Sequence, residues 1–249
     1  ALVAAGRRFR GERLGILGLG SIGAGALRLL VDASTQPAEI LLADVQARME
    51  HLEAIKERLL GLGVSCPIRL IVSSAVVPEA FYDSTLIVGA TSVPELLDVD
   101  RLRPGTILVD DSFPKCVNIE RAILRMRDRQ DLLITDAGML SAPHPLKLDF
   151  VVLDESRRAE SLDNMRFRSP ERMTACVLSS ALSAVDSASR PTRGTPRAED
   201  VDAHLDGLRR HGFLASALQL EHFRIPDAAL ASFRSHFGAA ERSGSEAAE

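Results

Sequence analysis

Short apolar runs alternate with longer amphipathic stretches from about residue 14 to residue 150. The runs are rich in Leu, Ile and Val, as expected for strands buried on both faces of a parallel sheet. The amphipathic stretches between them have the spacing of helices. This order predicts an α/β fold with a doubly wound, mostly parallel sheet. The predicted strands are Leu14–Gly18, Ile40–Asp44, Ile68–Val72, Thr85–Val88, Thr106–Val109 and Leu132–Thr135, and the predicted helices are Ile22–Val31, Gln46–Leu60 and Val117–Arg127.

The pattern changes after Phe150, where the strand signal ends and the sequence becomes typical of a helical segment. Ser169, Pro170 and Glu171 have the residue types of a helix start, because Ser caps a helix, Pro fits its first turn and an acid suits its positive end. We therefore expect a helix from this point to about Ala188. Two further helices, separated from it by a loop over residues 189–197, are predicted at 199–210 and 226–236.

A glycine-rich turn with the sequence GLGSIG follows the first predicted strand and begins the first helix. Each glycine has a mechanical reason to be there. Gly18 permits a tight turn, Gly20 lets the backbone approach a pyrophosphate, and Gly23 lets the helix pack closely on the strand. This strand, turn and helix together predict a Rossmann-like dinucleotide site.

The residues around the turn suggest which dinucleotide binds. The backbone N–H groups of Ser21 and Ile22, at the helix start, would face its phosphates. Asp44 ends the second strand, about 20 residues after the turn, where an acid binds the adenosine ribose and repels a 2′-phosphate. Arg48 lies one helical turn further on and would reach such a phosphate. Asp44 thus favours NADH, while Arg48 leaves NADPH open.

Three loops are predicted at the carboxyl edge of the sheet, where cofactors of doubly wound folds bind. Ala90, Thr91 and Ser92 follow the fourth strand and are expected to line the nicotinamide ribose. The loop 110–115 follows the fifth strand and the loop 136–138 follows the sixth. These two loops carry the polar groups nearest the expected point of hydride transfer.

These patterns give a domain organisation. We expect a Rossmann dinucleotide-binding domain over residues 1–155, a C-terminal helical region over 156–238 and a disordered tail over 239–249. The chain begins with Ala1, and its first ten residues resemble the last turns of a helix. This start indicates a fragment that lacks an N-terminal region, and with it part of the substrate site.

Composition excludes several classes of protein. The 249 residues include 30 basic and 34 acidic side chains, with a formal net charge of -4 and no basic stripe of the kind that binds nucleic acid. No apolar run is long enough for a transmembrane segment. Three scattered cysteines suit neither a disulfide framework nor a metal site and are typical of reduced thiols. A cytoplasmic protein without metal is therefore expected.

Cys176 is the residue outside the dinucleotide site with the best claim to chemistry. On a helix that begins at Pro170, Arg172 would lie one turn before Cys176, with Ser179 and Ser180 one turn after it on the same face. A guanidinium in that place would favour the thiolate, which is the reactive form. Free cysteines are more often small buried apolar residues, so spacing alone leaves both readings open.

A family resemblance adds to this reading. The segment PERMTAC at 170–176, the later RHGF at 210–213 and the pair at 217–218 look like the C-terminal region of the cyanobacterial long-chain fatty acyl-[acyl-carrier-protein] reductases, which form aldehydes. The turn at 18–23 matches their cofactor turn, and VDDSFPK at 109–115 resembles their segment IDGGYPK. The resemblance extends from about Leu14 to Leu220, and the family's N-terminal substrate domain has no counterpart in this chain.

The resemblance implies a function and site residues. It places Cys176 as the nucleophile that accepts the acyl group from an acyl carrier protein or coenzyme A thioester. Hydride from a nicotinamide would then release an aldehyde, with Lys115, Ser112 and the backbone of the loop 136–138 as candidate donors to the developing oxyanion. The family has Arg in place of Asp44 and uses NADPH, so the resemblance and the residue favour different cofactors.

Two other functions remain open at this point. A Rossmann dehydrogenase that acts on a small amino or hydroxy acid would need no covalent intermediate and no reactive thiol. A module that binds a dinucleotide without catalysis would turn over no thioester. Replacement of Cys176 separates both from a thioester reductase.

Overall fold

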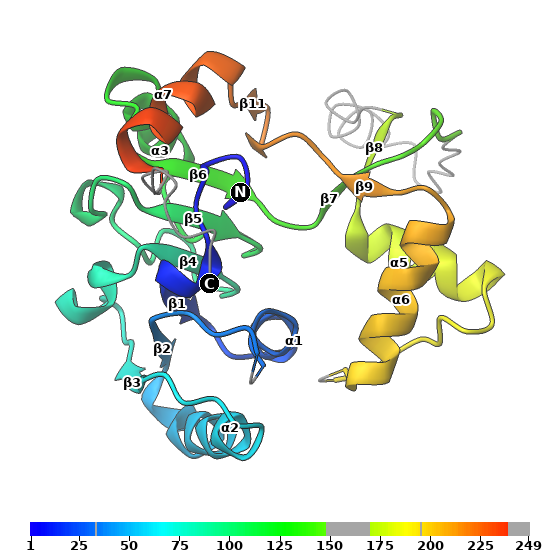
Figure 1. Cartoon of the computed structure of the whole chain (residues 1–249), viewed down its shortest axis with the longest axis horizontal. Coiled ribbons are helices and arrows are strands. Elements are labelled where there is room, and N and C mark those ends of the chain that lie inside the picture. The colour runs from blue at the N-terminus through cyan, green and yellow to red at the C-terminus, as the bar shows by residue number, and fades with distance from the viewer. Residues whose placement is uncertain (33, 148–169, 195, 239–249) are drawn as a thin grey trace, which may run out of the picture.

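The computed structural model describes residues 1–32, 34–147, 170–194 and 196–238. Its largest feature is a six-stranded parallel sheet, drawn in blue to green in Figure 1. All six predicted strands are confirmed, with their ends moved by at most one residue. The strands are β1 (Arg13–Leu17), β2 (Glu39–Asp44), β3 (Ile68–Val72), β4 (Leu86–Gly89), β5 (Ile107–Asp110) and β6 (Leu133–Asp136).

The order of strands confirms the Rossmann-like fold. The sheet runs β3-β2-β1-β4-β5-β6, and every pair of neighbours is parallel. Successive strands are added on one side of β1 up to β3 and on its other side from β4 onwards, so the strand order reverses between β1 and β4. In doubly wound folds, the ligand binds at this switch point, in the crevice outside the carboxyl ends of the strands. Gly18, which follows β1, and Ala90, which follows β4, both lie at that point.

The sheet is buried between helices. Right-handed crossovers place α1 (Ser21–Leu30) and α2 (Met49–Gly61) on one face and α3 (Ile119–Asp128) on the other. The three helices confirm the prediction, although a 3-10 turn over Gln46–Arg48 precedes α2. Leu14 and Ile16 of β1 have no exposed surface, which explains why the strands are apolar throughout.

A second, smaller part of the molecule follows β6 and differs from the all-helical prediction. β7 (Met139–Ser141) pairs antiparallel with β8 (Arg172–Thr174) and β9 (Leu214–Ala215), and the sheet carries the helices α5 (Ala175–Val185) and α6 (Ala198–Arg210). The helix expected from Pro170 in fact begins at Ala175. Residues 172–174 alternate between an inward Met173 and outward neighbours, a strand pattern too short to be recognised in the sequence.

The end of the described chain returns to the parallel sheet. The hairpin of β10 (Gln219–Leu220) and β11 (Phe223–Arg224) lies beside β6, where Thr135 and Gln219 exchange two hydrogen bonds of 3.0 and 3.2 Å. α7 (Asp227–Phe237) then packs beside α3 (Figure 1). The predicted helix at 226–236 is thus confirmed. The first six residues form turns and not the predicted end of a helix.

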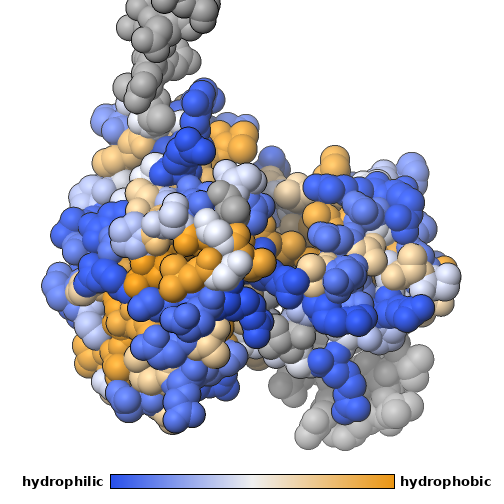
Figure 2. All heavy atoms as spheres, turned by 60° about the horizontal axis from the view of Figure 1, so that its bottom comes forward, coloured by the Kyte–Doolittle hydropathy of each residue, from blue (hydrophilic) through white to orange (hydrophobic). Residues whose placement is uncertain are grey.

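The surface differs between the two parts. Figure 2 shows apolar side chains gathered on the part that carries the parallel sheet, whereas the part that carries α5 and α6 is mostly hydrophilic on the same side. Within the described ranges, no helix combines the length and the apolar character needed to cross a membrane. Ser169, expected as a helix cap, the boundary at 155–156 and the tail 239–249 lie outside the described residues.

Candidate functional site

The glycine turn between β1 and α1 has the geometry that a dinucleotide needs. Gly18 has a φ of 89°, a left-handed conformation that side chains disfavour, and it lies against the backbone of Ala90. An added Cβ at Gly23 would overlap the carbonyl oxygen of Gly18. A Cβ at Gly20, in contrast, would meet nothing within 4 Å. The open backbone at Gly20 is the cradle that a pyrophosphate would fill.

The start of α1 completes this cradle. Ser21 and Ile22 are exposed, and Gly20 caps the helix without a side chain of its own. The free N–H groups of the first turn therefore face solvent at the carboxyl edge of the sheet, where an anion binds favourably. Gly18 and Gly23 thus show the tight turn and the close packing predicted for them, and the backbone at Gly20 is open, as a bound pyrophosphate would require.

Asp44 supports the glycine turn through its carboxylate. Its Oδ2 accepts a hydrogen bond of 2.8 Å from the N–H of Leu19, and its Oδ1 accepts one of 2.8 Å from Val45. A carboxylate has about four acceptor sites, so capacity remains for ribose hydroxyls. Arg48 is exposed at the start of α2, four residues after Asp44. The residues present therefore fit a dinucleotide at this edge.

The loop after β4 lies across the switch point from the glycine turn. The N–H of Ala90 donates to Leu17 at 2.8 Å, and the N–H of Thr91 donates to the hydroxyl of Ser112 at 3.1 Å. Ser92 is exposed beyond them. These bonds connect the loop to β1 and to the loop after β5, so Ala90, Thr91 and Ser92 stand where the sequence places them.

Asp110 organises the loop after β5. It is fully buried, and its carboxylate accepts hydrogen bonds from the N–H groups of Ser112 (2.9 Å) and Cys116 (3.0 Å). Burial, with the nearby charge of Asp110, raises the pKa of the Cys116 thiol well above its usual value. Cys116 is therefore an inert core residue.

Lys115 joins the ends of β5 and β6. Its Nζ lies 2.9 Å from Oδ1 of Asp136 and donates to the backbone oxygen of Asp110 at 3.0 Å. Burial alone would lower the pKa of Lys115, but the hydrogen bond and charge of Asp136 outweigh burial and raise that pKa. Lys115 is thus held as a cation at the carboxyl edge, where negative charge on a substrate oxygen would be stabilised.

Cys176 lies at the start of α5, at this same edge. The N–H of Ala175 donates to the carbonyl oxygen of Gly138 at 2.6 Å, which fixes the first turn of the helix to the loop after β6. Cys176 is free and exposed, and its Sγ lies 3.3 Å from the hydroxyl of Thr174. The thiol therefore stands in the first turn of a helix whose start is bonded to the loop after β6.

Arg172 does not lie where the sequence predicted. It belongs to β8, so it cannot share a helical face with Cys176, and its guanidinium hydrogen-bonds the side chain of Gln219. The expected pairing of Arg172 with the thiol is therefore wrong in its geometry. Ser180, in contrast, does lie one turn after Cys176, where its hydroxyl donates to the Cys176 carbonyl at 3.1 Å.

Three contacts of the site have no recognisable sequence signal, although the loops 110–115 and 136–138 were themselves expected at this edge. Thr174 is the polar neighbour of the Cys176 sulfur, Gly138 has a φ of 68° and anchors α5, and Asp111 lies beside Gly138. Phe113 is 89% exposed between Asp111 and Lys115, which suits contact with an apolar ligand. The contacts of these residues arise when β7 turns back from β6, and no spacing rule predicts them.

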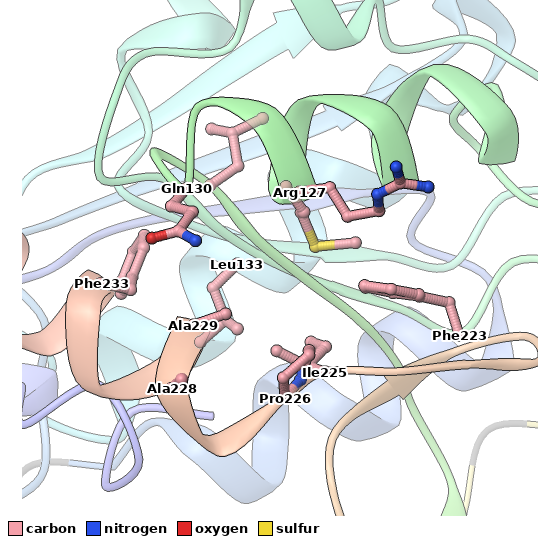
Figure 3. A pocket seen from close by; sticks show the side chains of 11 residues that line it. Arg127, Gln130, Leu133, Phe223, Ile225, Pro226, Ala228, Ala229 and Phe233 are labelled. Atoms are coloured by element: carbon pink, nitrogen blue, oxygen red, sulfur yellow. The ribbon is translucent and has the colours of Figure 1, made fainter.

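Two cavities are lined by other residues. An apolar cavity of about 140 Å³ lies between α3 and α7, with Leu133, Ile225 and Phe233 directed into it (Figure 3). A polar cavity lies on the small sheet and is lined by residues that include His144, Arg172 and Ser216. Among the described residues, no group of three or more His, Cys, Asp and Glu side chains is placed to hold a metal ion.

Comparison with known proteins gives short or distant likenesses. No family model matches the chain. A segment of 72 residues is 35% identical to the aminotransferase PigE of Serratia sp. (strain ATCC 39006), which corresponds to 28% of this chain and 8% of that protein. The chain thus covers a small fraction of the curated relative's length.

Two solved structures are similar in part. Shikimate 5-dehydrogenase from Listeria monocytogenes, in complex with shikimate and NAD, has 18% identity and a TM-score of 0.38 over 54% of this chain and 48% of its own. The Δ1-pyrroline-2-carboxylate reductase of Thermococcus litoralis, in complex with NADH and L-proline, has 20% identity and a TM-score of 0.34 over 45% of this chain and 32% of its own.

Proposed function

We propose that the chain is an oxidoreductase that uses NADH or NADPH to reduce an acyl thioester to an aldehyde through an acyl-enzyme on Cys176. One observation carries the proposal. The hydrogen bond from Ala175 to Gly138 fixes an exposed free thiol to the carboxyl edge of the sheet, where the glycine turn would hold a dinucleotide. A nucleophile and a hydride source would then share one edge.

In the first half of the reaction, Cys176 is the only residue that forms a covalent bond with the substrate. Its thiolate attacks the thioester carbonyl of an acyl carrier protein or coenzyme A substrate, forms an acyl thioester on the enzyme and releases the carrier thiol. Exposure of Cys176 leaves the sulfur accessible to a substrate of this size.

The second half of the reaction needs a donor for charge on the substrate oxygen. When bound, the dinucleotide would supply the hydride. Lys115 is cationic and fixed by Asp136 and by the Asp110 carbonyl, so it is preorganised to stabilise that oxygen at no cost in reorganisation. Ser112, whose N–H is tied to Asp110, shares this loop.

A two-step experiment tests the proposal. The protein is incubated with a long-chain acyl-coenzyme A without dinucleotide, its intact mass is measured, and NADH or NADPH is then added with detection of aldehyde. We expect an acyl adduct in the wild type and in Cys66→Ala, a partly buried control thiol, and none in Cys176→Ala. Aldehyde should follow only after the dinucleotide is added.

Each rival function gives a different result. An acyl adduct that persists in Cys176→Ala would overturn the thiol mechanism. Dinucleotide binding without adduct or aldehyde would identify a non-catalytic module. Turnover of a small hydroxy or amino acid that is unchanged in Cys176→Ala would identify a dehydrogenase without a covalent intermediate.

A further inference from the structure

Asp111 lies at the junction between the parallel sheet and the start of α5. It follows β5 directly, and its N–H donates to the carbonyl of Gly89 at 2.8 Å. The position that a Cβ would take at Gly138 is 3.5 Å from Oδ1 of Asp111 and 3.8 Å from the Cβ of Ala175. Because Gly138 has no side chain, this space stays open between the Asp111 carboxyl and the residue next to Cys176.

The Asp111 carboxyl differs from its two acidic neighbours. Asp110 accepts two backbone hydrogen bonds, and Asp136 pairs with Lys115 and accepts a hydrogen bond of 2.8 Å from the N–H of Glu221. None of the residues that the structure describes donates a hydrogen bond to the carboxyl of Asp111. This group therefore remains available to a ligand in the junction.

The surroundings of Asp111 favour its protonated form. Burial raises the pKa of the Asp111 carboxyl, the negative charges of Asp110 and Asp136 add to this effect, and the charge of Lys115 opposes it. Cys176 of α5 is the residue next to Ala175, and the charge of Glu221 helps to raise the pKa of Lys115. A carboxylic acid beside a carbonyl that gains negative charge is suited to donate a proton.

We propose that Asp111 is the residue that donates a proton to, and takes it back from, the substrate oxygen during reduction of the Cys176 acyl-enzyme. This inference rests on the proposed function and adds a catalytic residue to it. Lys115 remains the fixed cation, held by its bonds to Asp136 and Asp110, and its raised pKa makes it a weaker acid than Asp111.

The proposed steps balance in atoms and electrons. A hydride, with its two electrons, adds to the carbonyl carbon of the acyl thioester, and the dinucleotide is oxidised. The O–H of Asp111 breaks, its proton goes to the carbonyl oxygen, and a hemithioacetal forms on Cys176. The Asp111 carboxylate then takes the hydroxyl proton while the C–S bond breaks, which releases the aldehyde and regenerates the thiolate and the acid.

The test separates acylation from reduction. Asp111→Asn keeps the size of the side chain and removes the acid, and Asp128→Asn, at the exposed end of α3, is the matched control. Acyl-enzyme is formed from long-chain acyl-coenzyme A, isolated, and reduced in a single turnover over a range of pH. We expect normal acylation in both variants, and a rate of reduction lowered by about a hundredfold or more in Asp111→Asn alone.

Two readouts distinguish an acid from a structural residue. The wild-type reduction rate should fall as pH rises through the raised pKa of Asp111, and this decline should be absent in Asp111→Asn. In the dinucleotide-free protein, infrared spectroscopy should show the C=O stretch of a protonated carboxyl that titrates in the wild type and is missing in Asp111→Asn. Both readouts should be unchanged in Asp128→Asn.

The outcomes are separable. Reduction of the Asp111→Asn acyl-enzyme at the wild-type rate and with the wild-type pH profile would overturn this inference and leave the proposed function intact. A wild type that forms no acyl adduct would overturn the proposed function, and this inference with it.

Discussion

Gly20 and Gly23 belong to the same turn but meet different surroundings. A Cβ at Gly20 reaches open space, so Gly20→Val should fold normally while its side chain occupies the place of a pyrophosphate. We expect the dissociation constant for NADH or NADPH to rise about tenfold or more, which is about 1.4 kcal/mol of binding free energy. Isothermal titration calorimetry measures the affinity, and an unchanged affinity would contradict the assignment of this cradle.

Gly23→Ala is the companion change. Its Cβ would overlap the Gly18 carbonyl oxygen, so the helix must move away from β1. We expect the free energy of unfolding to fall by about 1–3 kcal/mol, as for other overpacked sites. Urea denaturation followed by circular dichroism measures this loss. Gly20→Val should show no such loss, which separates a binding role from a packing role.

Asp44 bears on the choice between NADH and NADPH. Its carboxylate ends β2 beside the glycine turn, where an acid would repel a 2′-phosphate, and the exposed Arg48 is the N-cap of the next helix. We expect the wild type to bind NADH more tightly, and Asp44→Ser to shift the ratio of affinities toward NADPH by about tenfold. Arg48→Ala in the same background should reverse that shift. A wild type that prefers NADPH would show that Asp44 does not repel the phosphate.

At the scale of residues, the sequence predicts those parts of the site whose role follows from backbone geometry. The three glycines and Asp44 occupy fixed places in a strand–turn–helix unit, so their positions follow from spacing. Asp111 and Gly138 meet only because β5 and β6 end at one edge and the chain then turns toward α5. Such contacts depend on tertiary structure and leave no local pattern.

The strand β8 shows the limit of sequence patterns at the scale of elements. Ser-Pro-Glu is a typical helix start, yet Pro170 and Glu171 form a turn and the next three residues pair with β7. The antiparallel bonds to β7 outweigh the weak local preference for a helix. The six parallel strands were predictable because each is buried on both faces and apolar throughout.

Arg172 of β8 should therefore stabilise the contact between the small sheet and the hairpin of β10 and β11, without acting on the Cys176 thiol. Its guanidinium bonds the side chain of Gln219, a residue 8% exposed beside β6, and Arg172→Ala would leave that amide without its charged partner. We expect the free energy of unfolding to fall by about 1–3 kcal/mol. The rate of alkylation of Cys176 by iodoacetamide should stay at the wild-type value. A large drop in that rate would restore Arg172 as an activating residue.

At the scale of the molecule, the C-terminal segment packs against the parallel sheet and against the first residues of the chain. The segment after α6 returns to the parallel sheet through Gln219 and Thr135, and Phe237 of α7 lies against Gly105 in the connection to β5. Gly6 lies against Arg234 of the same helix. The sequence predicts α7 as a helix, but its place beside α3 depends on contacts more than ninety residues apart along the chain.

Replacement of Phe233 tests whether the packing of α7 stabilises the whole parallel sheet. Its side chain is 2% exposed, is directed into the apolar cavity with Leu133 and Ile225 (Figure 3), and belongs to the core cluster that includes β1. Phe233→Ala should lower the free energy of unfolding by about 3–5 kcal/mol and lower Tm in a single cooperative transition, because removal of a buried ring leaves a void against β6. Asp227→Ala, exposed in the first turn of the same helix, is the control, and there we expect a loss below about 1 kcal/mol. If Phe233→Ala melted α7 alone and left the dinucleotide affinity and the Tm of the sheet unchanged, α7 would be an appendage and not part of the Rossmann core.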